Sequence, residues 1–98
     1  MRLEWSPLAL EDRDRIFDYI EQDNPHMAVV VDGRIQEQAE NLRVFPESGR
    51  PGRIEGTREL IINRTPYIAA YRILTGAVRI LRVLHGAQLW PENMPESR

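Results

Sequence analysis

The 98-residue chain is expected to form one α+β domain: an N-terminal strand, then an α-helical hairpin packed on an antiparallel β-sheet. Three features predict this class. The first half holds two long segments with helical spacing of apolar residues, and each begins with a capping residue followed by proline. Three strand-like segments follow in the second half. The domain is assigned to residues 1–91 and a C-terminal tail to residues 92–98.

The first half predicts one strand and two helices. Polar and apolar residues alternate over residues 2–5, which suits a short strand. Ser6 before a proline predicts a helix over about residues 7–22, and Asn24 before a proline predicts a second helix over about residues 25–44. Because the loop between these two long helices is short, they should form an antiparallel hairpin.

The second predicted helix carries one continuous apolar stripe, with steps of three or four residues. Its members are Ala28, Val31, Ile35, Ala39, Leu42 and Phe45. Gly33 weakens this helix slightly, and Pro46 is expected to stop it.

The second half predicts a loop and a three-stranded meander. Residues 46–56 contain two prolines and three glycines and should form a loop. The short turn at Thr75 and Gly76 favours a hairpin, and the chain from Gly86 onward is expected to be irregular. With the helices on one face of the sheet, the other face should be free to meet a partner. The strands are expected over residues 57–63, 67–74 and 77–85.

The positive charge is all arginine and is concentrated in the second half. Residues 1–49 contain five arginines and eleven acidic residues, whereas residues 50–90 contain seven arginines and two glutamates. Such asymmetry indicates an anionic partner for the basic half. Arginine keeps its proton at any working pH, so it suits the binding of phosphate or carboxylate groups and is a poor general base.

Several site types are excluded by composition. The chain has no cysteine, so it can form neither a disulfide nor a thiolate site. It shows no metal-ligand spacing, and its Gly49–Gly52 segment lacks the lysine of a phosphate-binding loop, so no metal or other cofactor is expected. Its apolar runs are too short to cross a membrane, it shows no signal peptide, and a cytoplasmic location is expected.

The strand arginines have two interpretations. They can lie on an open face of the sheet and bind phosphate or carboxylate groups of a partner. Alternatively, they can bond the many carboxylates of the helices in the same chain. Arg72 and Arg79 flank the turn and can pair across it, whereas Arg79 and Arg82 share a face only if a bulge intervenes. The residues proposed to bind a target or partner are Arg50, Arg53, Arg58, Arg72, Arg79, Arg82 and Trp90.

His85 and two tyrosines are the other candidates. His85 ends the last predicted strand, where it can act as a general acid or base or can simply make one structural hydrogen bond. Tyr67 and Tyr71 lie four residues apart on one predicted strand and so share a face. They can stack on bases, but packing at the edge of the core is the favoured interpretation.

Six short motifs occur in order along the chain. They are Trp5-Ser6-Pro7, Tyr19-Ile20 with Asn24-Pro25, Gly49-Arg50-Pro51-Gly52-Arg53, Gly56-Thr57-Arg58-Glu59-Leu60, Pro66-Tyr67-Ile68-Ala69-Ala70-Tyr71-Arg72, and Ile80-Leu81-Arg82-Val83-Leu84-His85. Together they resemble the RelE/ParE superfamily of bacterial type II toxin–antitoxin toxins, over residues 2–91. The fold that this resemblance implies agrees with the fold predicted from the patterns above.

The resemblance implies one of two activities. RelE-like members are ribosome-dependent ribonucleases that use lysines and arginines, or a Glu/Arg/His/Tyr set, whereas ParE-like members inhibit DNA gyrase. This chain has no lysine, Gly86 follows His85 where one ribonuclease branch has tyrosine, Ile68 stands where that branch has arginine, and Gly52 stands where glutamate is expected. These departures favour the ParE-like branch.

The expected function is therefore a ParE-like toxin that inhibits DNA gyrase, without a catalytic site of its own, in growth inhibition and plasmid maintenance. A ParD-like antitoxin should neutralise it in a complex of more than two chains and should supply the DNA contact. The alternative is a RelE-like mRNA endoribonuclease that would use Arg58, Arg72, Arg82 and His85. A third interpretation, a nucleic-acid-binding module, is disfavoured by the net charge of −2.

Overall fold

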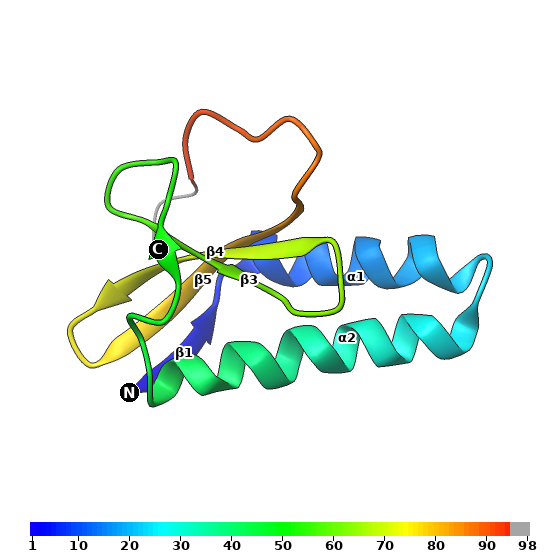
Figure 1. Ribbon diagram of the computed structural model, residues 1–98, viewed down its shortest axis with the longest axis horizontal. Helices are drawn as coiled ribbons and strands as arrows, with labels where there is room; N and C mark the ends of the chain where they lie inside the picture. The colour runs from blue at the N-terminus through cyan, green and yellow to red at the C-terminus, as the bar shows by residue number, and fades with distance from the viewer. Residues whose placement is uncertain (95–98) are drawn as a thin grey trace.

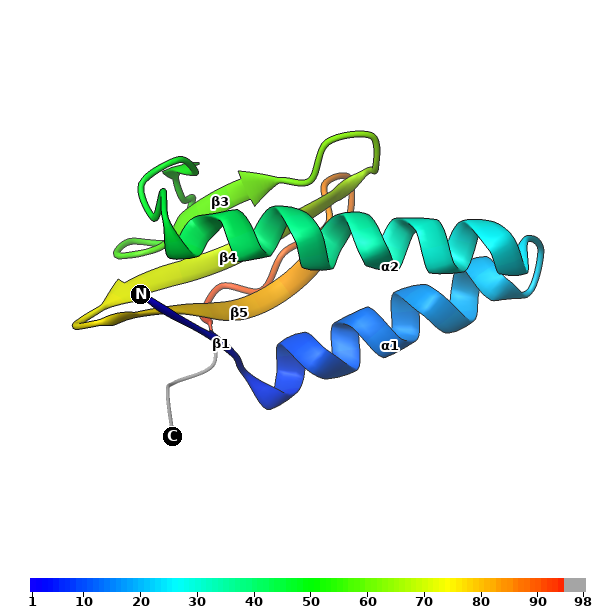
Figure 2. The same ribbon diagram turned by 90° about the horizontal axis from the view of Figure 1, so that it is seen from below.

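The structure, a computed structural model, describes residues 1–94. A helical hairpin covers one face of a five-stranded sheet, and the tip of the hairpin extends beyond the sheet (Figures 1 and 2). The elements are β1 (Arg2–Trp5), α1 (Pro7–Glu21), α2 (Pro25–Glu40), a 3-10 turn (Asn41–Arg43), β2 (Arg50–Pro51), β3 (Arg58–Ile61), β4 (Tyr67–Leu74) and β5 (Ala77–His85).

Both helices begin where the capping signals predict. The Ser6 side chain accepts a hydrogen bond from the Ala9 N–H at 3.0 Å, and Asn24 Oδ1 accepts one from the Met27 N–H at 3.1 Å. The helix α2 ends at Glu40 rather than near Val44, and a 3-10 turn follows.

The placement of Phe45 in the buried stripe of α2 is therefore wrong. The other members of that stripe, from Ala28 to Leu42, are buried, but Phe45 is 65% exposed. The stripe depends on the spacing of an α-helix, and that spacing stops with the helix at Glu40.

The sheet has the strand order β1-β5-β4-β3-β2, and it is mixed rather than wholly antiparallel. The meander of β3, β4 and β5 is antiparallel, as predicted. The strand β1 joins β5 in parallel, with Arg2 opposite Ala77 and Trp5 opposite Ile80. An alternating sequence pattern does not specify strand direction, so the parallel edge could not be predicted from it. The two-residue strand β2 forms within the predicted loop and pairs with β3.

A β-bulge interrupts the pairing of β4 with β5. Ala70 lies opposite Arg82, but the next residue, Tyr71, lies opposite Ile80, which leaves Leu81 of β5 as the extra residue. This is the kind of irregularity on which a shared face for Arg79 and Arg82 depends. Arg72 lies opposite Arg79 across the turn, as the sequence suggests.

The main core lies between the helices and the sheet. Tyr67 and Tyr71 belong to it, with side chains of α1, α2 and β5, which agrees with their expected packing against the core. Among residues 1–94, no helix is both long and apolar enough to span a membrane.

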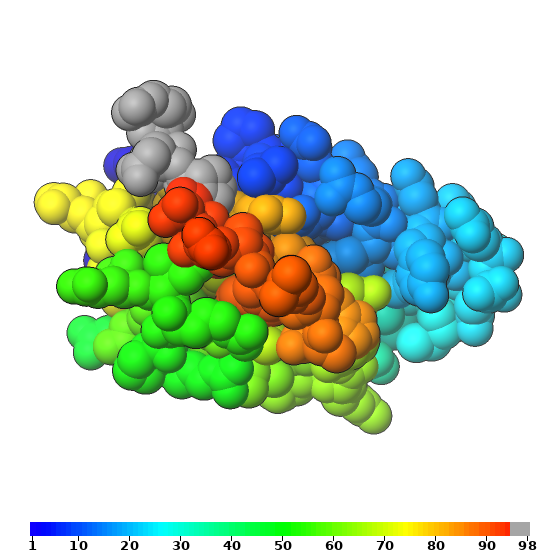
Figure 3. Space-filling view, turned by 90° about the horizontal axis from the view of Figure 1, so that it is seen from above, coloured from blue at the N-terminus to red at the C-terminus, as the bar shows by residue number. Residues whose placement is uncertain are grey.

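The opposite face of the sheet is not free, which corrects the expectation of an open face. Ala70, Leu81 and Leu84 form a second apolar cluster with Met94, against which Trp90 also packs. In Figure 3 the irregular segment 86–94, coloured orange to red, lies across this face beside the loop that precedes β3. The sheet is apolar on both faces, so the chain uses its own C-terminal segment as the second layer.

Candidate functional site

Most arginines of the second half bond groups within the same chain. The guanidinium of Arg79 bonds Glu4 of the neighbouring strand at 2.6 and 2.9 Å. Arg58 bonds the carbonyl oxygen of Gly49 at 2.6 Å, and Arg72 bonds that of Gly56 at 3.2 Å. The partners of these three arginines lie within the chain but are not the helix carboxylates that the second interpretation named. Arg82, in contrast, bonds a helix carboxylate, that of Asp12.

Glu59 joins the loop before β3 to the sheet. Its side chain is 2% exposed and lies between Arg50, at 3.0 Å, and Arg53, at 3.1 Å. Arg53 also lies over the ring of Trp90, 3.6 Å from its centroid. Burial alone would raise the pKa of Glu59, but hydrogen bonds from the Arg53 backbone and from both guanidiniums outweigh it and lower the pKa.

Asp12 of α1 is the buried partner of Arg82. Its carboxylate, 3% exposed, accepts two hydrogen bonds from Arg82, at 2.8 and 3.0 Å, and a third from the Val83 backbone N–H at 2.9 Å. The strand β1 pairs with β5 only as far as Ile80, so Asp12 satisfies a backbone donor that β1 does not reach. The hydrogen bonds to Asp12 also raise the pKa of Arg82.

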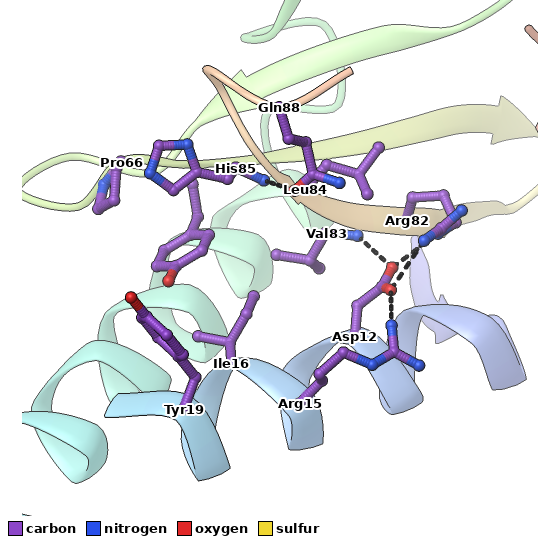
Figure 4. A pocket seen from close by; sticks show the side chains of 11 residues that line it. Asp12, Arg15, Ile16, Tyr19, Pro66, Arg82, Val83, Leu84, His85 and Gln88 are labelled. Carbon is purple, nitrogen blue, oxygen red and sulfur yellow. Dashed lines mark hydrogen bonds and ion pairs between the residues drawn. The ribbon is translucent and has the colours of Figure 1, made fainter. Parts of the chain in front are cut away.

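A hollow of about 480 Å³ lies beside this ion pair, between α1 and the end of β5. We call it the His85 pocket. Figure 4 shows Arg15 and Tyr19 extending from α1 and His85 extending from the end of β5. The rings of His85 and Tyr67 meet edge to face, with centroids 5.6 Å apart. The pocket is lined by Asp12, Arg15, Ile16, Tyr19, Pro66, Tyr67, Arg82, Val83, Leu84, His85 and Gln88.

The four residues named for a ribonuclease site do not meet in one place. Arg82 and His85 line the His85 pocket, whereas Arg58 and Arg72 line two other hollows, of about 270 and 470 Å³. Since β4 pairs Arg72 with Arg79 and Tyr67 with His85, Arg72 and His85 lie about five residues apart along the strands, or roughly 17 Å. Phosphodiester cleavage needs its acid, base and charge-stabilising groups within hydrogen-bond reach of one phosphate.

Sequence reasoning missed Asp12, Glu59 and Arg15. Asp12 lies three residues after Ala9 and four before Ile16, so it falls on the apolar face of α1, where an unpaired carboxylate is costly. That position was the available signal for a buried ion pair. Glu59 and Arg15 gave no comparable signal. Residues 1–94 contain no cluster of three or more histidine, aspartate or glutamate side chains that could hold a metal ion.

Comparison with known proteins defines the class of protein that carries this fold. The family described as the ParE toxin of type II toxin–antitoxin systems, parDE, matches residues 3–90. A chain from the chromosomal ParDE toxin–antitoxin system of P. aeruginosa superposes with a TM-score of 0.81 at 31% identity, covering 87% of this chain and 95% of that one.

Two sequence relatives also carry toxin names. The protein Y4kP of Sinorhizobium fredii is 46% identical over 91 residues, which cover 93% of this chain and 94% of Y4kP. Toxin RelE2 of Caulobacter vibrioides is 36% identical over 85 residues, which cover 87% of this chain and 94% of RelE2. The chain belongs to the ParE toxin family of type II toxin–antitoxin systems.

Proposed function

We propose that this toxin acts by inhibiting DNA gyrase through a protein interface, without a catalytic site of its own. The observation that carries this proposal is the dispersal of the ribonuclease candidates over three hollows. Arg58 and Arg72 are also engaged with backbone carbonyl oxygens, and the chain has no lysine.

The state of His85 supports the same proposal. Its Nδ1 accepts a hydrogen bond from the Ala87 backbone N–H at 3.0 Å. A neutral imidazole then carries its proton on Nε2, so the nitrogen that remains free donates a hydrogen bond and does not accept a proton. As arranged, His85 is not a general base for attack by a ribose hydroxyl.

The family supports an antitoxin as the partner of this chain. A ParD-like antitoxin would neutralise the toxin in the cytoplasm and would make the DNA contact. The proposed binding residues differ in availability: Arg50 and Arg53 have side chains that are 50% and 42% exposed, whereas Arg79 and Arg82 are 21% and 16% exposed. Arg50 and Arg53, beside Trp90, are therefore the stronger candidates for contact with a partner.

The alternative function is a RelE-like ribosome-dependent ribonuclease. It is favoured by the relative named Toxin RelE2 and by the presence of Arg82 and His85 in one pocket. This activity would need either a rearrangement that frees Arg82 from Asp12 or catalytic groups supplied by the ribosome.

One pair of assays separates the two functions. Purified toxin at micromolar concentration is added to gyrase with relaxed plasmid, and in parallel to ribosomes translating a defined message. The proposal predicts loss of supercoiling and an intact message in primer extension. Normal supercoiling, together with ribosome-dependent cuts that disappear in His85→Ala, would establish the ribonuclease instead.

A further inference from the structure

Tyr67 brings a hydroxyl group to the wall of the His85 pocket. Tyr67 is 8% exposed and lines the pocket. Its backbone N–H is bonded to Thr65, but its hydroxyl has no hydrogen-bond partner among residues 1–94. No side-chain polar atom in this part of the chain is both fully inaccessible and unpaired, so the hydroxyl opens into the pocket. A ligand that enters can therefore complete its hydrogen bonding.

The free polar groups around this hydroxyl are mainly donors. Burial raises the pKa of Tyr67, and the nearby Tyr19 raises it further, so the phenol keeps its proton. His85 presents Nε2–H, because its Nδ1 is already bonded to Ala87. Arg15, whose side chain is 69% exposed, forms an ion pair with Asp12 at 3.6 Å. This separation is longer than a hydrogen bond, so the guanidinium can still donate hydrogen bonds to a ligand.

The net charge of the pocket suits a ligand with one negative charge. Arg15 and Arg82 contribute two positive charges and Asp12 one negative charge, which leaves a single positive excess. A guanidinium with neighbouring hydroxyl donors suits a carboxylate. The apolar lining, which includes Ile16, Pro66 and Leu84, suits the methylene groups that carry such a carboxylate.

A polyanion fits this place poorly. The helix α1 also carries the exposed residues Glu11, Asp14 and Asp18, next in sequence to the pocket residues Asp12, Arg15 and Tyr19, and they repel a nucleic-acid backbone. A single carboxylate that enters the pocket neutralises its positive charge. A nucleic acid, in contrast, would also place several phosphates close to the acidic surface of α1. The acidic surface also favours basic residues in the partner on either side of the inserted carboxylate.

We propose that the His85 pocket binds the side-chain carboxylate of one Asp or Glu of the antitoxin, and that Arg15 and the hydroxyl of Tyr67 contribute hydrogen-bond donors to it. This inference rests on the proposed pairing of the chain with an antitoxin. It makes the pocket a specificity site, because an antitoxin with an apolar or basic residue at that place would leave these donors unpaired.

The test uses the complex formed with the cognate ParD-like antitoxin proposed above. Dissociation constants are measured for the wild-type toxin, Tyr67→Phe and Arg15→Gln. The matched control is Arg43→Gln, because Arg43 is 54% exposed and pairs with Glu40 three residues away, much as Arg15 does with Asp12. We expect affinity to fall several-fold for Tyr67→Phe and about tenfold or more for Arg15→Gln, with no change for Arg43→Gln.

A second measurement separates recognition from a general structural effect. Each Asp and Glu of the antitoxin is changed to its amide, and one of these changes should weaken binding to the wild-type toxin but have little further effect on Arg15→Gln. Unchanged affinity in both pocket variants, an absence of such coupling, or no binding of the antitoxin to the wild-type toxin would overturn the proposal.

Gyrase inhibition by the free toxin is a separate readout in the same experiment. Antitoxin binding that depends on the pocket, combined with unimpeded gyrase, would refute the proposed target and leave the carboxylate site standing. Gyrase inhibition, combined with antitoxin binding that is unaffected by the pocket variants, would refute the carboxylate site and support the proposed target.

Discussion

Removal of the Asp12 carboxylate is the most severe single perturbation that the structure suggests. In Asp12→Ala, the Arg82 guanidinium, whose side chain is 16% exposed, loses both of its carboxylate hydrogen bonds, and the Val83 N–H loses its acceptor. Breaking a buried ion pair from one side costs about 3–5 kcal/mol, because the remaining charge stays buried without compensation. The orphaned backbone donor contributes to that cost.

This loss is large for a domain of this size. At about 2.1 cal/mol/K of unfolding entropy per residue, each kcal/mol lowers the Tm of such a chain by roughly 5 °C, so we expect a decrease of roughly 15–25 °C. Urea denaturation followed by circular dichroism gives the free energy of unfolding, and a thermal scan gives the Tm.

The matched control is Asp18→Ala, at an exposed position of the same helix, which makes the same change in helix propensity. It should alter stability by no more than about 0.5 kcal/mol. A loss of less than about 1 kcal/mol in Asp12→Ala would refute the reasoning, because the ion pair would then be compensated by water or by another group.

Three further predictions concern stability. The lowered pKa of Glu59, below its ordinary value of 4.5, means that the unfolded chain binds a proton more readily than the folded one, so this contribution is complete above pH 4.5 and is lost as the pH falls through the folded pKa. Acid titration of the urea midpoint should therefore show a smaller pH dependence in Glu59→Gln, and an unchanged pH dependence at acid pH would contradict the lowered pKa of Glu59. Gly33 lies in α2 with open space where a Cβ would be added, so Gly33→Ala should stabilise the fold by about 0.5–1 kcal/mol. Gly56 has φ +82°, and a guanidinium lies 2.5 Å from the position of an added Cβ. Gly56→Ala should therefore destabilise the fold by about 1–2 kcal/mol. Equal urea midpoints for Gly33→Ala and Gly56→Ala would contradict these backbone conformations.

Local signals in the sequence predict most of the elements. The caps at Ser6 and Asn24 act within three residues along the chain, and β4 and β5 are short apolar segments bounded by turn residues. These are short-range effects, so they can be read without knowledge of the fold. The family resemblance, carried by the order of short motifs, added the correct class of protein.

Long-range features could not be predicted in the same way. The parallel pairing of β1 with β5, the bulge at Leu81 and the Asp12–Arg82 pair all join residues that are distant in the sequence. The covering of the outer face by residues 86–94 depends on Trp90 and Met94, which have no periodic pattern to reveal their packing. The candidate arginines were identified by type, but whether each is free or paired depends on partners that only the fold brings close.

The most direct test of the account is the amount of gyrase–DNA cleavage complex formed as purified toxin is titrated into gyrase, ATP and supercoiled plasmid. After denaturation of the gyrase, linear DNA should increase with toxin concentration, and antitoxin added in excess should abolish the increase. A constant background of linear DNA across the titration, with a toxin preparation that still arrests growth when expressed in cells, would contradict the claim that this fold acts on gyrase.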